Sequence, residues 1–211
     1  MLYKDPFIIS PETFQLIQEL QSFPQLDGFC LVGGTALALQ LGHRNSIDID
    51  LFIQSNFSDD DLVSFLSKKY EFKEIFRRKN TIISLINNIK TDFIKHDYPI
   101  IFSPVTEEGI TYLSKEDIAA MKFHAIIQSG KRLKDFIDIY YLLHHFSMRE
   151  MIGFFTTKYS YSNAMIAMKA VNYFDEIDES IDPPNLLNPI TLNQIKKRIR
   201  EATLEPMKIF K

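Results

Sequence analysis

The sequence predicts an α+β fold, in which a small mixed β-sheet with flanking helices is followed by a helical C-terminal half. Residues 47–53 alternate apolar and polar side chains with a period of two, which is typical of a half-buried strand. Two β-rich runs, 81–86 and 89–94, are joined by an Asn-Asn pair that favours a two-residue hairpin turn. From Ser114 onward the apolar residues recur at helical spacing. We therefore expect an α/β domain over residues 1–110 and a helical domain over residues 111–211.

The composition is that of an ordinary globular protein. The chain has 211 residues, of which 45% are hydrophobic and 24% charged, and this excludes a disordered chain or a fibre. The net charge of −3 provides no overall attraction for nucleic acid, so any such binding needs a local patch. The single cysteine, Cys30, lies in an apolar run and is expected to be a buried thiol in a reducing compartment. Without a signal-like N-terminus or a long apolar stretch, we expect a cytoplasmic protein with no membrane partner.

In the first half, the elements follow from caps and breakers. Ser10 and Pro11 are typical of the start of a helix. Residues 29–32 form a short apolar run that predicts a buried strand, Gly33-Gly34 ends it, and residues 35–40 are good helix formers. Strand 47–53 comes next, and Ser58, followed by three aspartates, begins another helix.

The second half consists of predicted helices with recognisable starts. Ser114 to Asp117 resembles a capping box with Asp in the usual Glu position, and Ser147 to Glu150 is a second capping box. The periodicity and the breakers place the helices at 115–128, 133–146, after Ser147, near 162–174 and at 191–203.

Asp48 and Asp50 are the sharpest chemical signal. Two residues apart on a strand, their carboxylates project from the same face of the sheet. Paired acids repel each other and lose hydration when buried, and a divalent cation such as Mg²⁺ compensates both effects. The alternative is a surface strand with two solvated acids.

A glycine turn stands close to this acid pair in the sequence. Gly33 and Gly34 are placed where a strand turns into a helix, so the backbone can approach a phosphate at the positive end of the helix dipole. The hydroxyl of Thr35 adds a donor. A Gly-Gly pair alone is most often just a turn, but a phosphate turn and an acid pair on adjacent strands together predict a nucleoside triphosphate site.

The chain resembles a known family at these positions. Gly33-Gly34, thirteen intervening residues and then Asp48-Ile49-Asp50-Leu51 resemble the signature of the DNA-polymerase-β-type nucleotidyltransferase superfamily. The run 31–39, with Arg44, Ser46 and 48–52, is similar to the AbiEii/AbiGii-type nucleotidyltransferases, which include toxins of type IV toxin–antitoxin systems. Residues 122–143 also resemble that family. The resemblance covers roughly residues 29–143 and implies a nucleotidyltransferase-type sheet.

The superfamily implies a third carboxylate on a later strand. Asp92 is the best candidate, because counting by twos places Lys90, Asp92 and Ile94 on one face of strand 89–94. Asp97 is the rival, near the strand end beside Pro99.

The resemblance also implies roles for charged residues farther along the chain. Lys122 would contact the triphosphate, although a lysine snorkelling from an apolar helix is the alternative. Lys134 would touch phosphate, and either Asp135 or Asp138 would orient Lys122 or take a substrate proton; acids in a first helical turn also occur without any function. Arg44, which precedes the acid pair together with Ser46, either reaches phosphate or holds the local geometry.

The implied activity is metal-dependent transfer of a nucleoside monophosphate from a nucleoside triphosphate to an acceptor hydroxyl. Asp48, Asp50 and Asp92 would hold Mg²⁺ or Mn²⁺, with Asp92 as the general base. The resemblance favours RNA as acceptor, such as the 3′ end of tRNA, in a toxin whose antitoxin is encoded nearby. A small-molecule or protein acceptor, or an inactive binding module of the same fold, remains open.

Overall fold

The computed structural model describes residues 1–181 and 183–211. The chain divides into two compact units, each of which is assembled from separate stretches of sequence. The first unit comprises Met1–Gln40, Asn45–Tyr98 and Pro104–Leu113. The second comprises Leu41–Arg44, Pro99–Ser103 and Ser114–Lys211.

The first unit is built on a mixed seven-stranded sheet, so the predicted α+β fold is confirmed. Its strand order is β3-β4-β5-β2-β1-β7-β6. The pairs β2–β5 and β1–β7 are parallel, and the other neighbouring pairs are antiparallel. The strands are β1 (Cys30–Leu31), β2 (Ile49–Ile53), β3 (Phe72–Arg78), β4 (Thr81–Ile86), β5 (Ile89–Lys95), β6 (Val105–Glu107) and β7 (Ile110–Tyr112).

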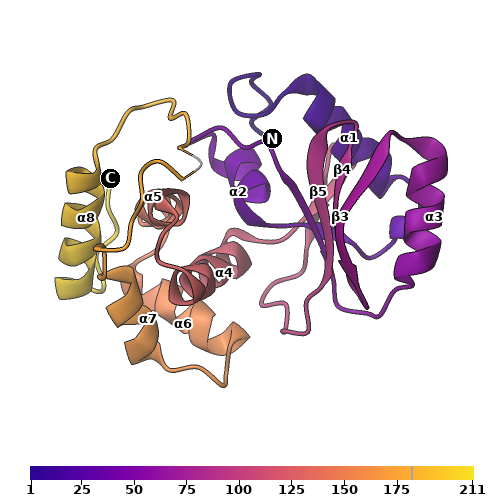
Figure 1. Ribbon diagram of the computed structural model, residues 1–211. Helices are drawn as coiled ribbons and strands as arrows, with labels where there is room; N and C mark the ends of the chain where they lie inside the picture. Colours follow the sequence, from indigo (N-terminus) through magenta and orange to yellow (C-terminus); the bar gives the residue numbers. More distant parts are fainter. Residues whose placement is uncertain (182) are drawn as a thin grey trace. The chain divides into compact units, whose positions relative to one another are not determined.

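Three α-helices and one 3₁₀ turn accompany this sheet, and the predicted caps begin two of the helices. The Ser10 hydroxyl accepts from the Thr13 amide at the start of α1 (Pro11–Gln21), and Ser58 does the same for Asp61 in α3 (Asp59–Lys69). Figure 1 shows α3 running alongside the strands at the β3 end of the sheet. The 3₁₀ turn η1 (Pro24–Leu26) leads into β1, and α2 (Gly33–Leu41) follows β1.

The hairpin between β4 and β5 is confirmed, with the register that the Asn pair predicts. Asn87 and Asn88 have φ angles of 50° and 65°, in the left-handed region that two-residue hairpin turns require. Strand β2 begins two residues later than expected, at Ile49, so Asp48 directly precedes the strand. Strands β3, β6 and β7 were not predicted. Strand β3 is an exposed sheet edge with no alternation of buried residues to reveal it.

The second unit is all-helical, as predicted. Within it, α4 lies between α5 and the pair formed by α6 and α7, and α8 lies beside α5 (Figure 1). The predicted helix 133–146 is shorter than expected and ends at Leu142. The helices are α4 (Lys115–Gln128), α5 (Leu133–Leu142), α6 (Met148–Lys158), α7 (Ala164–Val171) and α8 (Leu192–Leu204).

The two capping boxes have different outcomes. At Ser147 the box is complete, because the serine caps the Glu150 amide and Glu150 returns to the Ser147 amide. At Ser114 the prediction was wrong in one respect. The hydroxyl caps Asp117, but the Asp117 carboxylate accepts from the amides of Ile101 and Phe102 instead of the Ser114 amide. The shorter Asp side chain is used for a tertiary contact.

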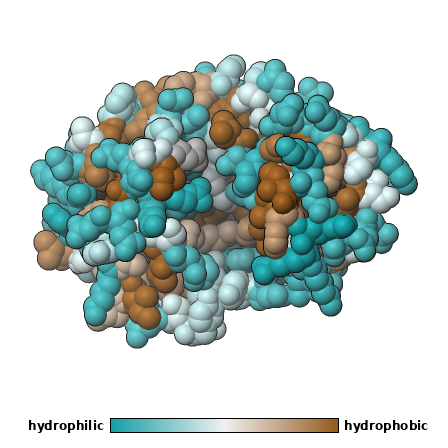
Figure 2. Space-filling model, in the orientation of Figure 1, coloured by the Kyte–Doolittle hydropathy of each residue, from teal (hydrophilic) through white to brown (hydrophobic). Residues whose placement is uncertain are grey.

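The core and surface agree with the composition. Cys30 is buried with its thiol free, as expected. In the view of Figure 2, hydrophobic residues form small separate groups on a hydrophilic surface. Among the described residues, no helix has both the length and the apolar character needed to cross a membrane.

Candidate active site

Asp50 and Asp92 lie opposite each other on neighbouring strands. The parallel pairing of β2 with β5 brings Asp50 level with Asp92, so both side chains project from the same face of the sheet. The opposite face of β2 carries the buried side chains of Ile49, Leu51 and Ile53. The apolar alternation therefore fixes which face of the sheet is acidic.

Lys90 is a positively charged neighbour of the acids on this face. Its ammonium Nζ is 2.9 Å from Asp92 Oδ2. Burial alone would lower the pKa of Lys90, but the hydrogen bond to Asp92 and the charges of Asp92, Asp50 and Asp48 together raise it. Asp48, Asp50 and Asp92 thus all act on one ammonium group, which is permanently charged at neutral pH.

Asp92 keeps one oxygen for another partner. Its side chain is buried, and within the described residues Asp92 Oδ1 has no hydrogen-bond partner. A buried carboxylate oxygen without a donor is costly, so it marks a place where a ligand or cation would be favourable.

Gly33 packs directly against the Asp50 carboxylate. Its φ of +69° lies in the left-handed region, and a Cβ at this position would come within 2.5 Å of Asp50 Oδ2. Any other residue would suffer both backbone strain and a steric overlap. The glycine turn at the start of α2 and the acidic face of β2 are therefore in contact.

Thr35 and Ser46 form hydrogen bonds that hold the backbone at Asp48. The Thr35 hydroxyl is 2.8 Å from the Ser46 hydroxyl and donates to the backbone carbonyl of Asp48. Both side chains are buried. In the described conformation these hydroxyls serve the backbone that carries the acid pair, and their predicted contact with phosphate stays a prediction.

In the second unit, Asp138 is the centre of a buried charge network. Its two oxygens accept from Arg44 Nε and Nη2 at 2.7 and 2.9 Å, and Oδ1 is also 2.8 Å from His43 Nε2. Lys122 Nζ lies 2.7 Å from Asp138 Oδ2. Burial would raise the pKa of Asp138, but the charges of Arg44 and Lys122 hold it well below its usual value.

Lys122 is buried in the same network. Its Nζ is also 2.8 Å from Asp135 Oδ1, and the two carboxylates raise the pKa of Lys122 against the opposing effect of burial. The snorkelling alternative does not describe this lysine, because its charged end is inside. Asp135 Oδ2 is buried without a hydrogen-bond partner among the described residues. Lys134 is buried nearby in sequence, in the first turn of α5.

The chemistry of the first-unit acids fits a hard divalent cation. Carboxylate oxygens are the ligands that Mg²⁺ prefers, and the orphaned Asp92 oxygen provides a vacant acceptor. Across residues 1–181 and 183–211, however, no three His, Cys, Asp or Glu side chains are gathered as a ready metal-binding group. Of the three acids, Asp92 contacts the Lys90 ammonium directly, and the charges of Asp50 and Asp48 also act on it.

The comparison with known families decides the classification. The AbiEii family, described as the nucleotidyl transferase toxin of type IV toxin–antitoxin systems, matches residues 15–107 and 83–206 of the chain. The chain belongs to the AbiEii family. The match spans both units, and it confirms the resemblance on which the expected activity depends: this is a nucleotidyltransferase of the AbiEii type.

Relatives of this AbiEii chain extend the comparison. An uncharacterised protein of Aquifex aeolicus, aq_aa25, is 30% identical over 185 residues, which cover 83% of this chain and 89% of that protein. Two crystal structures from Helicobacter pylori share the fold. JHP933 has a TM-score of 0.55 at 15% identity and covers 93% of this chain and 89% of its own. The other, described as a candidate nucleotidyltransferase, has a TM-score of 0.56 at 14% identity. The match covers 94% of this chain and 96% of that protein.

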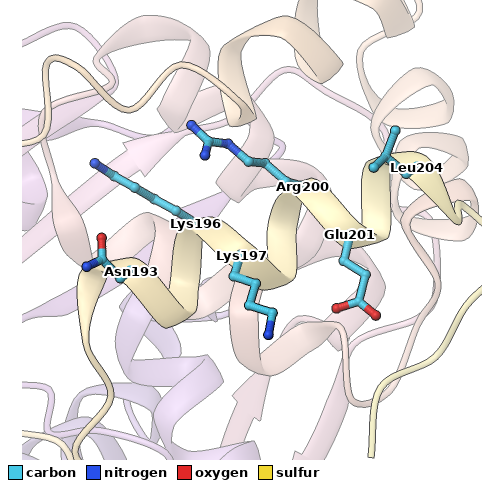
Figure 3. Close-up of a pocket in the computed structure, with 6 residues that line it drawn as sticks. All are labelled: Asn193, Lys196, Lys197, Arg200, Glu201 and Leu204. Atoms are coloured by element: carbon cyan, nitrogen blue, oxygen red, sulfur yellow. The ribbon is translucent and has the colours of Figure 1, made fainter.

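A basic groove lies on α8 of the AbiEii chain. It has a volume of about 410 Å³ and is lined by Asn193, Lys196, Lys197, Arg200, Glu201 and Leu204. Figure 3 shows Lys196 and Arg200 extending to one side of the helix and Lys197 and Glu201 to the other. A second group of basic residues, 77–79, is less available for binding an anionic ligand, because Arg77 already pairs with Asp60 and Glu74.

Sequence reasoning missed two members of these sites. Lys90 shares a strand face with Asp92 by the period-two rule, so its position was visible, but no function was attached to it. His43 was not considered. Its contact is with Asp138, 95 residues away, and no local pattern indicates such a pairing.

Proposed function

We propose that this chain is a metal-dependent nucleotidyltransferase, which moves a nucleoside monophosphate from a nucleoside triphosphate to an acceptor hydroxyl and releases pyrophosphate. The observation that carries the proposal is the level pairing of Asp50 with Asp92, with Asp50 directly against Gly33. Two carboxylates and a glycine turn meet at one end of the sheet, which is the combination that a phosphate–metal site requires.

Asp48, Asp50 and Asp92 would hold the cation, Mg²⁺ or Mn²⁺. When bound, the cation neutralises phosphate charge and makes the acceptor hydroxyl more acidic. The buried Asp92 oxygen without a hydrogen-bond donor supports this assignment, because a charged acceptor is otherwise left without compensation.

The start of α2 would bind the phosphates. The first amides of a helix have no acceptor within the helix, and the helix dipole favours an anion there. Gly33 and Gly34 have no Cβ, so a phosphate can approach the backbone closely. Thr35 and Ser46 keep the Asp48 backbone in register with this turn.

The transfer is an in-line displacement. An oxygen of the acceptor hydroxyl forms a bond to the α-phosphorus, and the bond from that phosphorus to the bridging oxygen breaks, so the electron pair leaves with pyrophosphate. Asp92 is also the candidate to accept the hydroxyl proton as general base. The chain's own contribution is to position the groups and to stabilise charge.

The residues of the second unit have a supporting place in the proposal. Lys122 is held in its charged form by Asp135 and Asp138, as a lysine that acts on phosphate must be. Asp135 retains an oxygen without a hydrogen-bond partner, 4.0 Å from Arg132 Nε, whereas both oxygens of Asp138 already accept from Arg44. This difference supports Asp135 as the more reactive acid and Asp138 as the positioning residue. Lys134 remains the second candidate for a phosphate contact.

RNA is our proposed acceptor, with tRNA first among the candidates. The type IV toxin family supports this choice and also implies an antitoxin as partner. The three cations of the α8 groove offer a local patch for a phosphate backbone, which the net charge of −3 does not. A small-molecule or protein hydroxyl remains the second candidate acceptor, and an inactive binding module the third.

A labelling experiment separates these candidates. The protein is incubated with α-labelled nucleoside triphosphates, Mg²⁺ and total cellular RNA, and the label is followed on gels. Label on tRNA supports the proposal, label on a protein or small molecule supports the second candidate, and no label supports the third. Asp48→Ala is the inactive control. Expression of the wild type should arrest growth, and Asp48→Ala should relieve the arrest.

A charge-reversal variant tests the acceptor surface. Lys196→Glu with Arg200→Glu removes two cations from the α8 groove and should weaken RNA binding and reduce its salt dependence. Lys68→Glu with Lys69→Glu, in the last turn of α3, is the matched control with the same change of charge. Equal losses in both variants would show that α8 is not the RNA surface.

A further inference from the structure

We propose that Lys90 is an internal counterion of the acidic site, and that its ammonium group and a divalent cation are alternative occupants of the space among Asp48, Asp50 and Asp92. The inference rests on the proposed function, since it takes these carboxylates as the cation ligands. It adds a residue that controls how tightly the cation binds.

The contacts show that the ammonium now serves the acids as a cation would. Lys90 Nζ lies 2.9 Å from Asp92 Oδ2, and Asp50 is level with Asp92 on the neighbouring strand. Lys90 and Asp92 are two residues apart on β5 and so share the acidic face. The sheet register itself therefore delivers a positive charge to the carboxylates.

The two partners of this ion pair differ in exposure to solvent. The Asp92 side chain is only 9% exposed, whereas the Lys90 side chain is 42% exposed. Lysine has a long flexible stem and one terminal charge, so Lys90 can move into solvent while Asp92 stays in place. Displacement of Lys90 thus requires no rearrangement of the sheet.

Charge explains why the two occupants exclude each other. With Lys90 in place, its ammonium neutralises part of the negative charge of Asp92, which lies level with Asp50. A divalent cation at the same carboxylates would lie within a few ångströms of the ammonium, and like charges at that distance repel strongly.

The consequence is a measurable restraint on metal binding. A cation that takes Asp92 Oδ2 must break the Lys90–Asp92 contact, and one that takes Oδ1 lies next to the ammonium and is repelled by it. In both cases the wild-type protein binds the cation more weakly than its three carboxylates alone would. Removing the ammonium should tighten binding by about tenfold, since a hydrogen bond to a charged group is worth about that factor.

Mn²⁺ binding in the absence of nucleotide tests the inference. Free Mn²⁺ is measured by its electron paramagnetic resonance signal, for the wild type and for Lys90→Met, Lys90→Arg and Lys95→Met. We expect Lys90→Met to bind about tenfold more tightly. Lys90→Arg keeps the charge and should bind as weakly as the wild type. Lys95 is on the same strand but pairs with Asp97, so Lys95→Met should match the wild type.

Thermal unfolding provides a second readout that does not involve activity. Without metal, Lys90→Met should unfold at a lower temperature than the wild type, because the acids lose their counterion. Mn²⁺ should then raise its unfolding temperature by more than it raises that of the wild type.

The outcomes separate this inference from the proposed function. Wild-type binding that Asp50→Asn abolishes, together with unchanged or weaker binding by Lys90→Met, overturns the inference and leaves the metal site standing. Tighter binding by both Lys90→Met and Lys90→Arg also overturns it, because charge is then not the cause. Absence of binding in every variant overturns both proposals. Binding by Lys90→Met alone supports the inference in its strongest form.

Discussion

The carboxylate of Asp50 lies against the α carbon of Gly33, so close that a methyl group on that carbon would be 2.5 Å from Asp50 Oδ2. The contact joins the start of α2 to strand β2. It makes the glycine a requirement of the acidic site itself, beyond its role in turning the chain.

Gly33→Ala should damage both the fold and the site. The substitution places a side chain at a φ of +69° and forces Asp50 to move, so we expect a loss of about 1–3 kcal/mol of stability and loss of transfer activity. Gly153→Ala, at an exposed position of α6 where the new methyl group meets no described atom within 4 Å beyond the adjoining helix backbone, should be slightly stabilising. Urea unfolding and the labelling assay measure the two effects. An active, fully stable Gly33→Ala protein would refute this reading of the turn.

Asp138→Asn should be strongly destabilising. The change leaves Arg44 and Lys122 buried without the charge that now pairs with them, and breaking such a pair costs about 3–5 kcal/mol. Asp97→Asn is the matched control, because its ion pair with Lys95 is mostly exposed and should contribute less than about 1 kcal/mol. Chemical unfolding of both variants decides the matter; similar losses would mean that the Asp138 network is not a stabilising core.

The same residue predicts an acid transition. The pKa of Asp138 is held well below its usual 3.8 in the folded protein, so its contribution to stability is complete above the unfolded-state pKa. That contribution is lost as the pH falls below about 4 toward the folded-state pKa. When the free energy of unfolding is measured between pH 3 and 7, it should fall less steeply at the acid end for Asp138→Asn than for the wild type. An identical slope in both proteins would contradict the assignment.

Asp117 should protect two backbone amides in the second unit. Its carboxylate accepts from the amides of Ile101 and Phe102 and is paired with the buried Lys158. In Asp117→Ala these two amides should exchange with solvent much faster than in the wild type, measured by hydrogen-exchange NMR. In Lys158→Met the Asp117 carboxylate still accepts from both amides. Their exchange should therefore change only as much as the overall free energy of unfolding changes. Unchanged exchange in Asp117→Ala would show that segment 99–103 is held by other contacts.

Local pattern was enough for the elements that carry the proposed cation ligands. Alternation over residues 47–53 assigned Asp48 and Asp50 to the face opposite the apolar side chains, and the Asn87-Asn88 turn established the hairpin that carries Asp92. The period of two also placed Lys90 beside Asp92. These inferences depend on neighbours within a few residues, where sequence spacing determines geometry.

Long-range pairing could not be predicted in the same way. That β2 and β5 are parallel neighbours, with Asp50 level with Asp92, depends on the order of strands in the sheet. The family resemblance singled out Asp138, but no local pattern showed that Arg44, 94 residues earlier, makes it the centre of a buried network. Strand β3 escaped prediction because an exposed edge carries no burial pattern.

The central claim is that Asp48, Asp50 and Asp92 hold a divalent cation and a triphosphate beside the Gly33 turn. Isothermal titration of the wild type, Asp50→Asn and the control Asp97→Asn with Mg²⁺ and a panel of nucleoside triphosphates tests it most directly. We predict that the wild type and Asp97→Asn bind at least one Mg²⁺–nucleotide pair with equal affinity and that Asp50→Asn loses this binding. Binding by Asp50→Asn as tight as that of the wild type would contradict the claim.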